Sequence, residues 1–321
     1  MNQLTNQQVE SFHRDGYLHI ENAISQSTVS LCRQACERMR SKCESGRYPN
    51  IRHEYLIADN EFRGIEHIFS EPVFEEEILK ALIETKVLEF SKQLLKEDEV
   101  SLILNRLHCT KYYGLSGFWH RDGACRENWH VQSSLHFYNE AGFFVVPGSH
   151  LDDPNDDRLI REYGGRRDSL DNMKLLPVRA GDLLLFDSAI FHRGQCPGRK
   201  KFSRAHVHLR ICRDTAVKNL SIFKDEGWSH MRALGIADDG WKDLFTKERP
   251  EPKFYMESIT RNNEKSLKFR TRQFKNRLSY GLSRFLGRDS ELLRKPNRII
   301  PYPYVKIPEG YEEFLREKRD D

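Results

Sequence analysis

Apolar residues recur at helical spacing through most of the first hundred positions. The spacing predicts a short helix over 5–14, with Thr5 as its N-cap and Gly16 at its end, followed by a strand over 17–20. A longer helix is predicted over 26–43, and a second helical region covers about 73–97. The amino-terminal part of the chain is therefore expected to be mainly helical.

After Glu99 the pattern changes to short strand-like runs separated by glycine, proline and aspartate turns. The runs lie at 100–113, 131–138, 143–146, 182–186 and 204–211. In the last run alternation is almost strict, which places Arg204, His206, His208 and Arg210 on one face and apolar residues on the other. This pattern predicts a sandwich or barrel of antiparallel strands whose apolar face packs against the helices and whose polar face lines a cavity.

Composition adds limits on the class of protein. The 321 residues contain no apolar run of the roughly 18 residues needed to span a bilayer, and the first ten residues lack a secretory-signal layout. The seven cysteines show no disulfide framework. Cys32 and Cys36 share a helix face, where small buried residues are expected rather than a metal site. These features favour a cytoplasmic protein.

The net charge of +4 hides an uneven distribution. Between 261 and 300 there are twelve Lys or Arg residues against three acids. Apolar residues recur among them, at Leu267, Phe274, Leu278, Leu282, Phe285 and Leu286. We expect 256–321 to be a basic extension that is partly an amphipathic helix. Its apolar side can pack on the barrel or on a partner chain, or 261–300 can contact an anionic membrane surface or a phosphate-bearing substrate. No nucleic-acid-reading module is present, so no specific nucleic acid is expected, and the oligomeric state stays open.

The string His-Arg-Asp-Gly occurs twice, at 13–16 and at 120–123. The first copy falls at a predicted helix end, where a polar turn closed by glycine explains it. The second copy lies beside strand-like sequence and is followed by His192 and Arg204. The kinase catalytic loop also contains His-Arg-Asp, but its asparagine is replaced by Glu127, and neither Asp-Phe-Gly nor a glycine-rich phosphate loop is present.

The second copy has the composition of a metal site. In His120-Arg121-Asp122 the histidine and aspartate share a strand face, and His192 completes a set of two histidines and one carboxylate. Such a set holds iron(II) in many non-haem oxygenases and leaves positions for a 2-oxo acid and dioxygen. Arg204 can clamp the far carboxylate of a co-substrate such as 2-oxoglutarate. The sequence therefore predicts His120, Asp122 and His192 as metal ligands and catalytic residues, and Arg204 as a cofactor-binding residue.

Residues 5–213 resemble the phytanoyl-CoA dioxygenase-like family of iron(II)- and 2-oxoglutarate-dependent oxygenases. The likeness rests on the opening 12–18 segment, the Trp119-to-Asp122 triplet, the Pro-Gly-Ser-His turn at 147–150, Gly181-Asp182, His192 and 203–205. It implies a mainly β fold with flanking helices. The core would be a double-stranded β-helix (a jelly-roll, cupin-like fold) over about 99–213 within a dioxygenase domain at 1–255. The amino-terminal helices would pack on one sheet.

The resemblance also implies a reaction. Fe(II) would act with 2-oxoglutarate and O2 as co-substrates, and Asn105 and Lys111 would join Arg204 in binding the cofactor. Because relatives that halogenate lack the carboxylate ligand, Asp122 favours hydroxylation. The polar face, with Gln132, His206, His208 and Arg210, favours a polar or anionic small molecule such as a sugar, glycolipid or phosphorylated metabolite. A fatty acyl thioester, a non-catalytic scaffold protein and a cupin-type enzyme without 2-oxoglutarate stay open as alternatives.

Overall fold

The fold was analysed in a computed structural model of the chain. It describes residues 3–45, 53–56, 61–66, 68–69, 73–110, 119–123, 125–126, 130–153, 156–164, 169–194, 204–213 and 224–246. The proposed 256–321 extension and Lys111 lie outside these residues. No helix in the described ranges is both long enough and apolar enough to cross a membrane.

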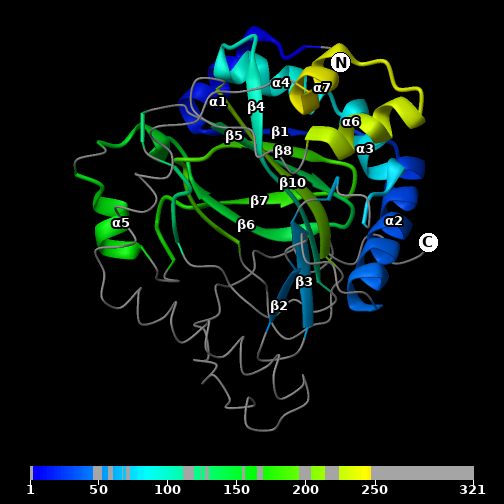
Figure 1. Cartoon of the computed structure of the whole chain (residues 1–321). Coiled ribbons are helices and arrows are strands. Elements are labelled where there is room, and N and C mark those ends of the chain that lie inside the picture. The colour runs from blue at the N-terminus through cyan, green and yellow to red at the C-terminus, as the bar shows by residue number, and fades with distance from the viewer. Residues whose placement is uncertain are drawn as a thin grey trace, which may run out of the picture.

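Helices in the described residues lie above and beside a β core (Figure 1). The α-helices are α1 (Asn6–Asp15), α2 (Gln26–Ser45), α3 (Glu76–Glu84), α4 (Val87–Leu95), α5 (Arg158–Tyr163), α6 (Lys224–Ala233) and α7 (Asp239–Thr246), with a 3-10 turn η1 (Ser149–Leu151). The strands are β1 (Tyr17–Ile20), β2 (His53–Leu56), β3 (Glu61–Glu66), β4 (Val100–Thr110), β5 (His130–His136), β6 (Glu140–Val146), β7 (Lys174–Val178), β8 (Leu183–Asp187), β9 (Phe191–Gly194) and β10 (Arg204–Arg213).

The strands form two antiparallel sheets. The larger sheet has the order β1-β8-β5-β10-β4-β3-β2, and the smaller sheet has the order β7-β6-β9. An isolated bridge between His120 and His192 extends the smaller sheet beyond β9. This arrangement is the jelly-roll core that the sequence predicts. It places His120 next to His192, although the two residues lie far apart in the chain.

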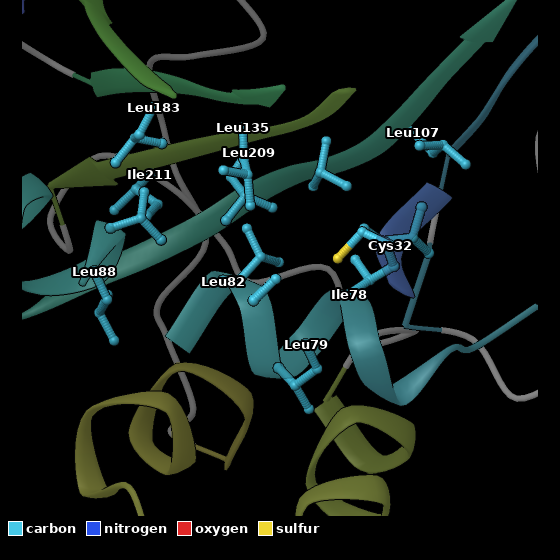
Figure 2. Packing of buried hydrophobic residues seen from close by; sticks show 14 of the residues in the cluster. Cys32, Ile78, Leu79, Leu82, Leu88, Leu107, Leu135, Leu183, Leu209 and Ile211 are labelled. Carbon is cyan, nitrogen blue, oxygen red and sulfur yellow. The ribbon is translucent and has the colours of Figure 1, made fainter. Parts of the chain in front are cut away.

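Helices cover the outer face of the larger sheet, where α2 and α7 contact β4 and α4 contacts β5 and β10. In Figure 2 Ile78 and Leu82 of α3 point toward the labelled residues of the strands, whereas Leu79 points to the other side of the helix. Leu107, Leu135, Leu183 and Leu209 are fully buried there. The opposite face of the sheet contributes Leu184 and Phe186 to a second apolar cluster with Val145, Leu176, Val178 and Ile190. The apolar face of β10 thus packs against the helices, as predicted.

Local signals explain the helix ends. The Thr5 hydroxyl accepts from the Gln8 N–H at 3.2 Å and the Gln8 side chain accepts from the Thr5 N–H at 2.9 Å, forming a capping box. Gly16 ends α1 at a φ of 83°. The region predicted over 73–97 is two helices, because Lys86 takes a left-handed φ of 59°. Thr85 supports this break by bonding the Leu82 carbonyl and the Val87 N–H.

Candidate active site

His120, Asp122 and His192 lie together at one end of the barrel. His120 and His192 exchange two backbone hydrogen bonds of 3.0 Å, and the Asp122 N–H donates to the Ser188 carbonyl at 2.8 Å. The His120 Nε2 lies 3.9 Å from Asp122 Oδ1, and the His192 Nε2 lies 3.7 Å from Asp122 Oδ2. The His120 side chain is 46% exposed and that of His192 is 6% exposed, so the group opens to solvent on the His120 side. The three residues could hold a metal ion.

The His192 ring is prepared to act as a ligand. Its Nδ1 lies 2.9 Å from the Ile190 carbonyl oxygen, so Nδ1 carries the proton and donates it. That tautomer leaves a lone pair on Nε2, the nitrogen nearest Asp122. Burial, followed by the proximity of His120, lowers the pKa of His192 to about 4. The ring is therefore neutral near pH 7, as metal binding requires.

Asp122 is held ionised by its neighbours. Gln132 donates to its Oδ2 at 2.8 Å, and an Arg210 guanidinium nitrogen lies 3.1 Å from the same oxygen. Burial by itself raises the pKa of Asp122, but Arg210, the two histidines and the Gln132 hydrogen bond outweigh it and lower that pKa far below its ordinary range. The carboxylate is thus charged and oriented.

Arg121 supports the backbone of the candidate site, which the sequence reasoning missed. Its side chain is 4% exposed. It bonds Asp157 at 2.6 Å, the Ser149 carbonyl at 2.7 Å and the Ala189 carbonyl at 2.5 Å. These bonds fix the backbone between His120 and Asp122 to the turn that precedes His192. The run of acids at 152–157 was the available signal for this partner.

The first His-Arg-Asp-Gly copy is a helix end, as predicted. The Gly16 N–H donates to the Phe12 carbonyl at 2.7 Å, and a Cβ at Gly16 would lie 2.6 Å from the His150 ring. Arg14 pairs with its neighbour Asp15 at 2.6 Å, with 72% of the arginine side chain exposed. The same four-residue sequence therefore forms the end of a helix at 13–16 and part of the candidate metal site at 120–123.

Two of the predicted cofactor-binding residues can be placed. Arg204 is the first residue of β10, opposite Thr110 and two positions before His206. Asn105 pairs with the buried Leu209 and therefore lies on the helix-facing side of β4, and its role in cofactor binding stays a prediction. Its side-chain oxygen accepts from the Ile68 N–H at 2.7 Å. Alternation along β4 turns Arg106 and His108 toward the barrel interior instead.

The structure brings the four predicted substrate residues to the inner face, but in different roles. Gln132 accepts from Arg210 at 3.0 Å, and both side chains contact Asp122. His208 lies beside Phe186, with ring centroids 6.0 Å apart, and burial followed by Arg210 lowers its pKa well below the ordinary value. His206 lies 3.2 Å from Glu140. Gln132 and Arg210 are thus occupied in orienting Asp122.

The donor set fits a divalent iron ion. Two imidazoles and one ionised carboxylate meet, with the His192 Nε2 lone pair available and a side open to further ligands. His120, Asp122 and His192 would hold the ion.

A family model described as phytanoyl-CoA dioxygenase (PhyH) matches residues 12–196, more than half of the chain. The chain belongs to the PhyH family. The match runs from the end of α1 through α2, α3 and α4 and includes the His120-to-Asp122 triplet and His192. The predicted family is therefore confirmed.

Known proteins similar to this PhyH-family chain agree with that assignment. The ectoine dioxygenase of Nocardia farcinica is 23% identical over 236 residues, which cover 63% of this chain and 76% of that protein. The crystal structure of EctD from S. alaskensis with bound Fe has a TM-score of 0.51 at 20% identity, covering 67% of this chain and 79% of that one. The same enzyme with 2-oxoglutarate and 5-hydroxyectoine has a TM-score of 0.50 at 20% identity, over 65% and 76% of the two chains.

The solved structures confirm the jelly-roll fold, and the family model places the chain among the PhyH-type dioxygenases. At these identities they leave the substrate and the roles of individual residues as predictions.

Proposed function

We propose that this PhyH-family chain hydroxylates a C–H bond of a small polar or anionic molecule. In the overall reaction one oxygen atom of O2 enters the substrate as a hydroxyl group. The other oxidises 2-oxoglutarate to succinate and CO2. The observation that carries the proposal is the meeting of His120, Asp122 and His192 with the carboxylate intact. A bound iron would supply the oxidising chemistry.

The residues of the chain position the reactants. The Ile190 carbonyl holds the His192 ring in the tautomer that ligates through Nε2, and Gln132 with Arg210 holds Asp122. We assign Arg204 to the distal carboxylate of 2-oxoglutarate, because a guanidinium pairs with a carboxylate in a bidentate way. The exposed side of His120 is where a substrate would approach.

The polar inner face supports a polar or anionic substrate. His108, His206, His208 and Arg210 occupy facing positions of β4 and β10, on the barrel side. A long hydrocarbon chain against this face would remove water from polar side chains, at a cost of about 1–3 kcal/mol for each polar group that it leaves unsatisfied. A sugar, a glycolipid headgroup or a phosphorylated metabolite therefore suits the face better than a fatty acyl thioester.

Succinate production tests the reaction class. The purified chain is supplied with Fe(II), ascorbate, 2-oxoglutarate and pooled polar metabolites, and succinate and oxygenated products are measured by mass spectrometry with 18O2. We expect one 18O atom in the product and one succinate per hydroxylation. His120→Ala should abolish both, and Arg204→Ala should raise the KM for 2-oxoglutarate more than it lowers kcat. Absence of iron binding and turnover would favour a scaffold protein, and turnover without 2-oxoglutarate would favour a cupin-type enzyme.

The basic 261–300 segment supports a substrate at an anionic membrane surface, and it defines a second experiment. The full chain with Arg270, Arg277 and Arg284 changed to Glu is compared with a control in which all three become Lys. Sedimentation with phosphatidylserine vesicles should be lost in the first protein and kept in the second. Equal sedimentation of both proteins would remove the membrane from the proposal and leave a water-soluble substrate.

A further inference from the structure

A second cluster of metal-binding residue types lies inside the barrel, apart from the candidate iron ligands. His136 is the last residue of β5, Glu140 is the first residue of β6, and His206 lies on β10. All three are buried, with 2%, 3% and 5% of their surface exposed. The cluster therefore joins two neighbouring strands of the larger sheet to one strand of the smaller sheet.

Both imidazoles converge on a single carboxylate oxygen. Nδ1 of His136 and Nδ1 of His206 each lie 3.2 Å from Glu140 Oε2. The ring centroids of the two histidines are 4.7 Å apart, because the residues are direct partners in the β5–β10 pairing. One potential ligand atom from each residue lies within 4.8 Å of the others.

These contacts suit a shared cation better than hydrogen bonds. Among the described residues, His136 Nδ1 has no hydrogen-bond partner of acceptable geometry, although Glu140 is close. The other nitrogen of the ring, Nε2, lies 2.7 Å from the Ser134 hydroxyl, which orients it as the outer partners of metal-bound histidines do. When Nε2 of His136 carries the ring proton and donates it to the Ser134 hydroxyl, Nδ1 presents a lone pair toward the cluster.

The two 3.2 Å separations between Glu140 and the histidines match the size of a transition-metal site. Two ligand atoms that each lie about 2.0–2.1 Å from a zinc ion and are 3.2 Å apart subtend about 100° at the metal, close to the tetrahedral angle. A divalent cation would also place positive charge beside a carboxylate that is 3% exposed, without protonating either imidazole.

We propose that His136, Glu140 and His206 bind a second divalent transition-metal ion, with zinc the best match to two imidazoles and one carboxylate. His206 lies four residues before Arg210, which contacts Asp122, so the backbone positions of these two residues are about 13 Å apart along β10. The second ion links the two sheets, and in this role His206 is a metal ligand instead of a substrate contact.

Metal counting on the full chain tests the proposal. The protein is stripped with chelator and dialysed against Co2+ alone, and bound cobalt is measured by elemental mass spectrometry and by its visible spectrum. The variants are Glu140→Gln, the His120→Ala/Asp122→Ala double variant and the combination of all three. His150→Gln is the matched control, because this buried histidine bonds the His13 carbonyl and belongs to neither cluster.

We expect two ions per chain in the wild type and the control, one in Glu140→Gln, one in the double variant and none in the combined variant. Zn2+ should also raise the melting temperature of the double variant but not that of the combined variant. One ion in the wild type and none in the double variant would overturn the second site and leave the first. One ion that survives the double variant but is lost in Glu140→Gln would support the second site and remove the first. If Glu140→Gln fails to fold, the ion count of the His120→Ala/Asp122→Ala variant tests the second site by itself: one bound ion supports it, and none overturns it.

Discussion

Replacing Arg121 with leucine is the most direct test of how the chain builds its candidate metal site. The change keeps an apolar stem but removes a guanidinium that is 4% exposed and contacts two carboxylates and two carbonyl groups. Asp157, 19% exposed, loses its main cationic partner, whereas Asp152 is 38% exposed and can be solvated. Breaking a buried ion pair by removing one partner costs about 3–5 kcal/mol, and we expect a loss of unfolding free energy in that range.

The second copy of the same four letters supplies the control. Arg14 is 72% exposed and pairs only with its local neighbours, so Arg14→Leu should leave the midpoint of urea denaturation unchanged. Both variants are measured metal-free and after addition of Co2+. Cobalt affinity should fall only in Arg121→Leu, because the Ala189 contact ties the triplet to the turn before His192. A loss below about 1 kcal/mol, or equal losses in the two variants, would refute the reasoning.

Three further changes test other parts of the structure. Asp182→Ala removes the acceptor of two backbone N–H groups and of His19, and urea denaturation should show a loss of about 3 kcal/mol. Burial by itself raises the pKa of Asp182, but these hydrogen bonds outweigh it and lower the pKa. The stabilisation is therefore complete above pH ~4 and is lost as the pH falls through the lowered value, so acid titration should show the variant and wild type converging. Gly16→Ala places a Cβ 2.6 Å from the His150 ring at a φ of 83°, and thermal melting should show a loss of at least about 1 kcal/mol. Gln132→Leu removes a donor to Asp122, and dialysis should show Co2+ binding weakened about 10- to 100-fold.

Each of these three predictions has an outcome that contradicts it. Asp182→Asn keeps the shape without the charge, so stability equal to wild type would remove the charge from the argument. For Gly16, an alanine protein as stable as the wild type would show that the turn tolerates a side chain. For Gln132, the Gln132→Glu variant keeps a side chain of the same size but loses the amide that donates to Asp122. Unchanged cobalt affinity in both Gln132→Leu and Gln132→Glu would exclude a role for Gln132 in positioning Asp122.

Most helices and strands of the described chain follow local patterns that the sequence shows. The 6–15 helix has its own capping box and a glycine end, and the alternating residues of β10 separate into a helix-facing and a barrel-facing set. The break between α3 and α4 was not predicted, because it depends on one left-handed lysine inside an apolar run. The strands β2, β3, β7 and β9 were also missed, since short strands take their stability from neighbours that a local window does not contain.

The sequence by itself determined the family and predicted the candidate ligand types and their order along the chain, because these depend on residue identity and spacing. Only the tertiary structure decided which face Asn105 takes, that Gln132 and Arg210 support Asp122, and that Glu140 meets two histidines. The physical reason is strand register. Alternation tells which residues of one strand share a face, but pairing across the sheets decides which faces meet, and a shift of one residue would reverse them.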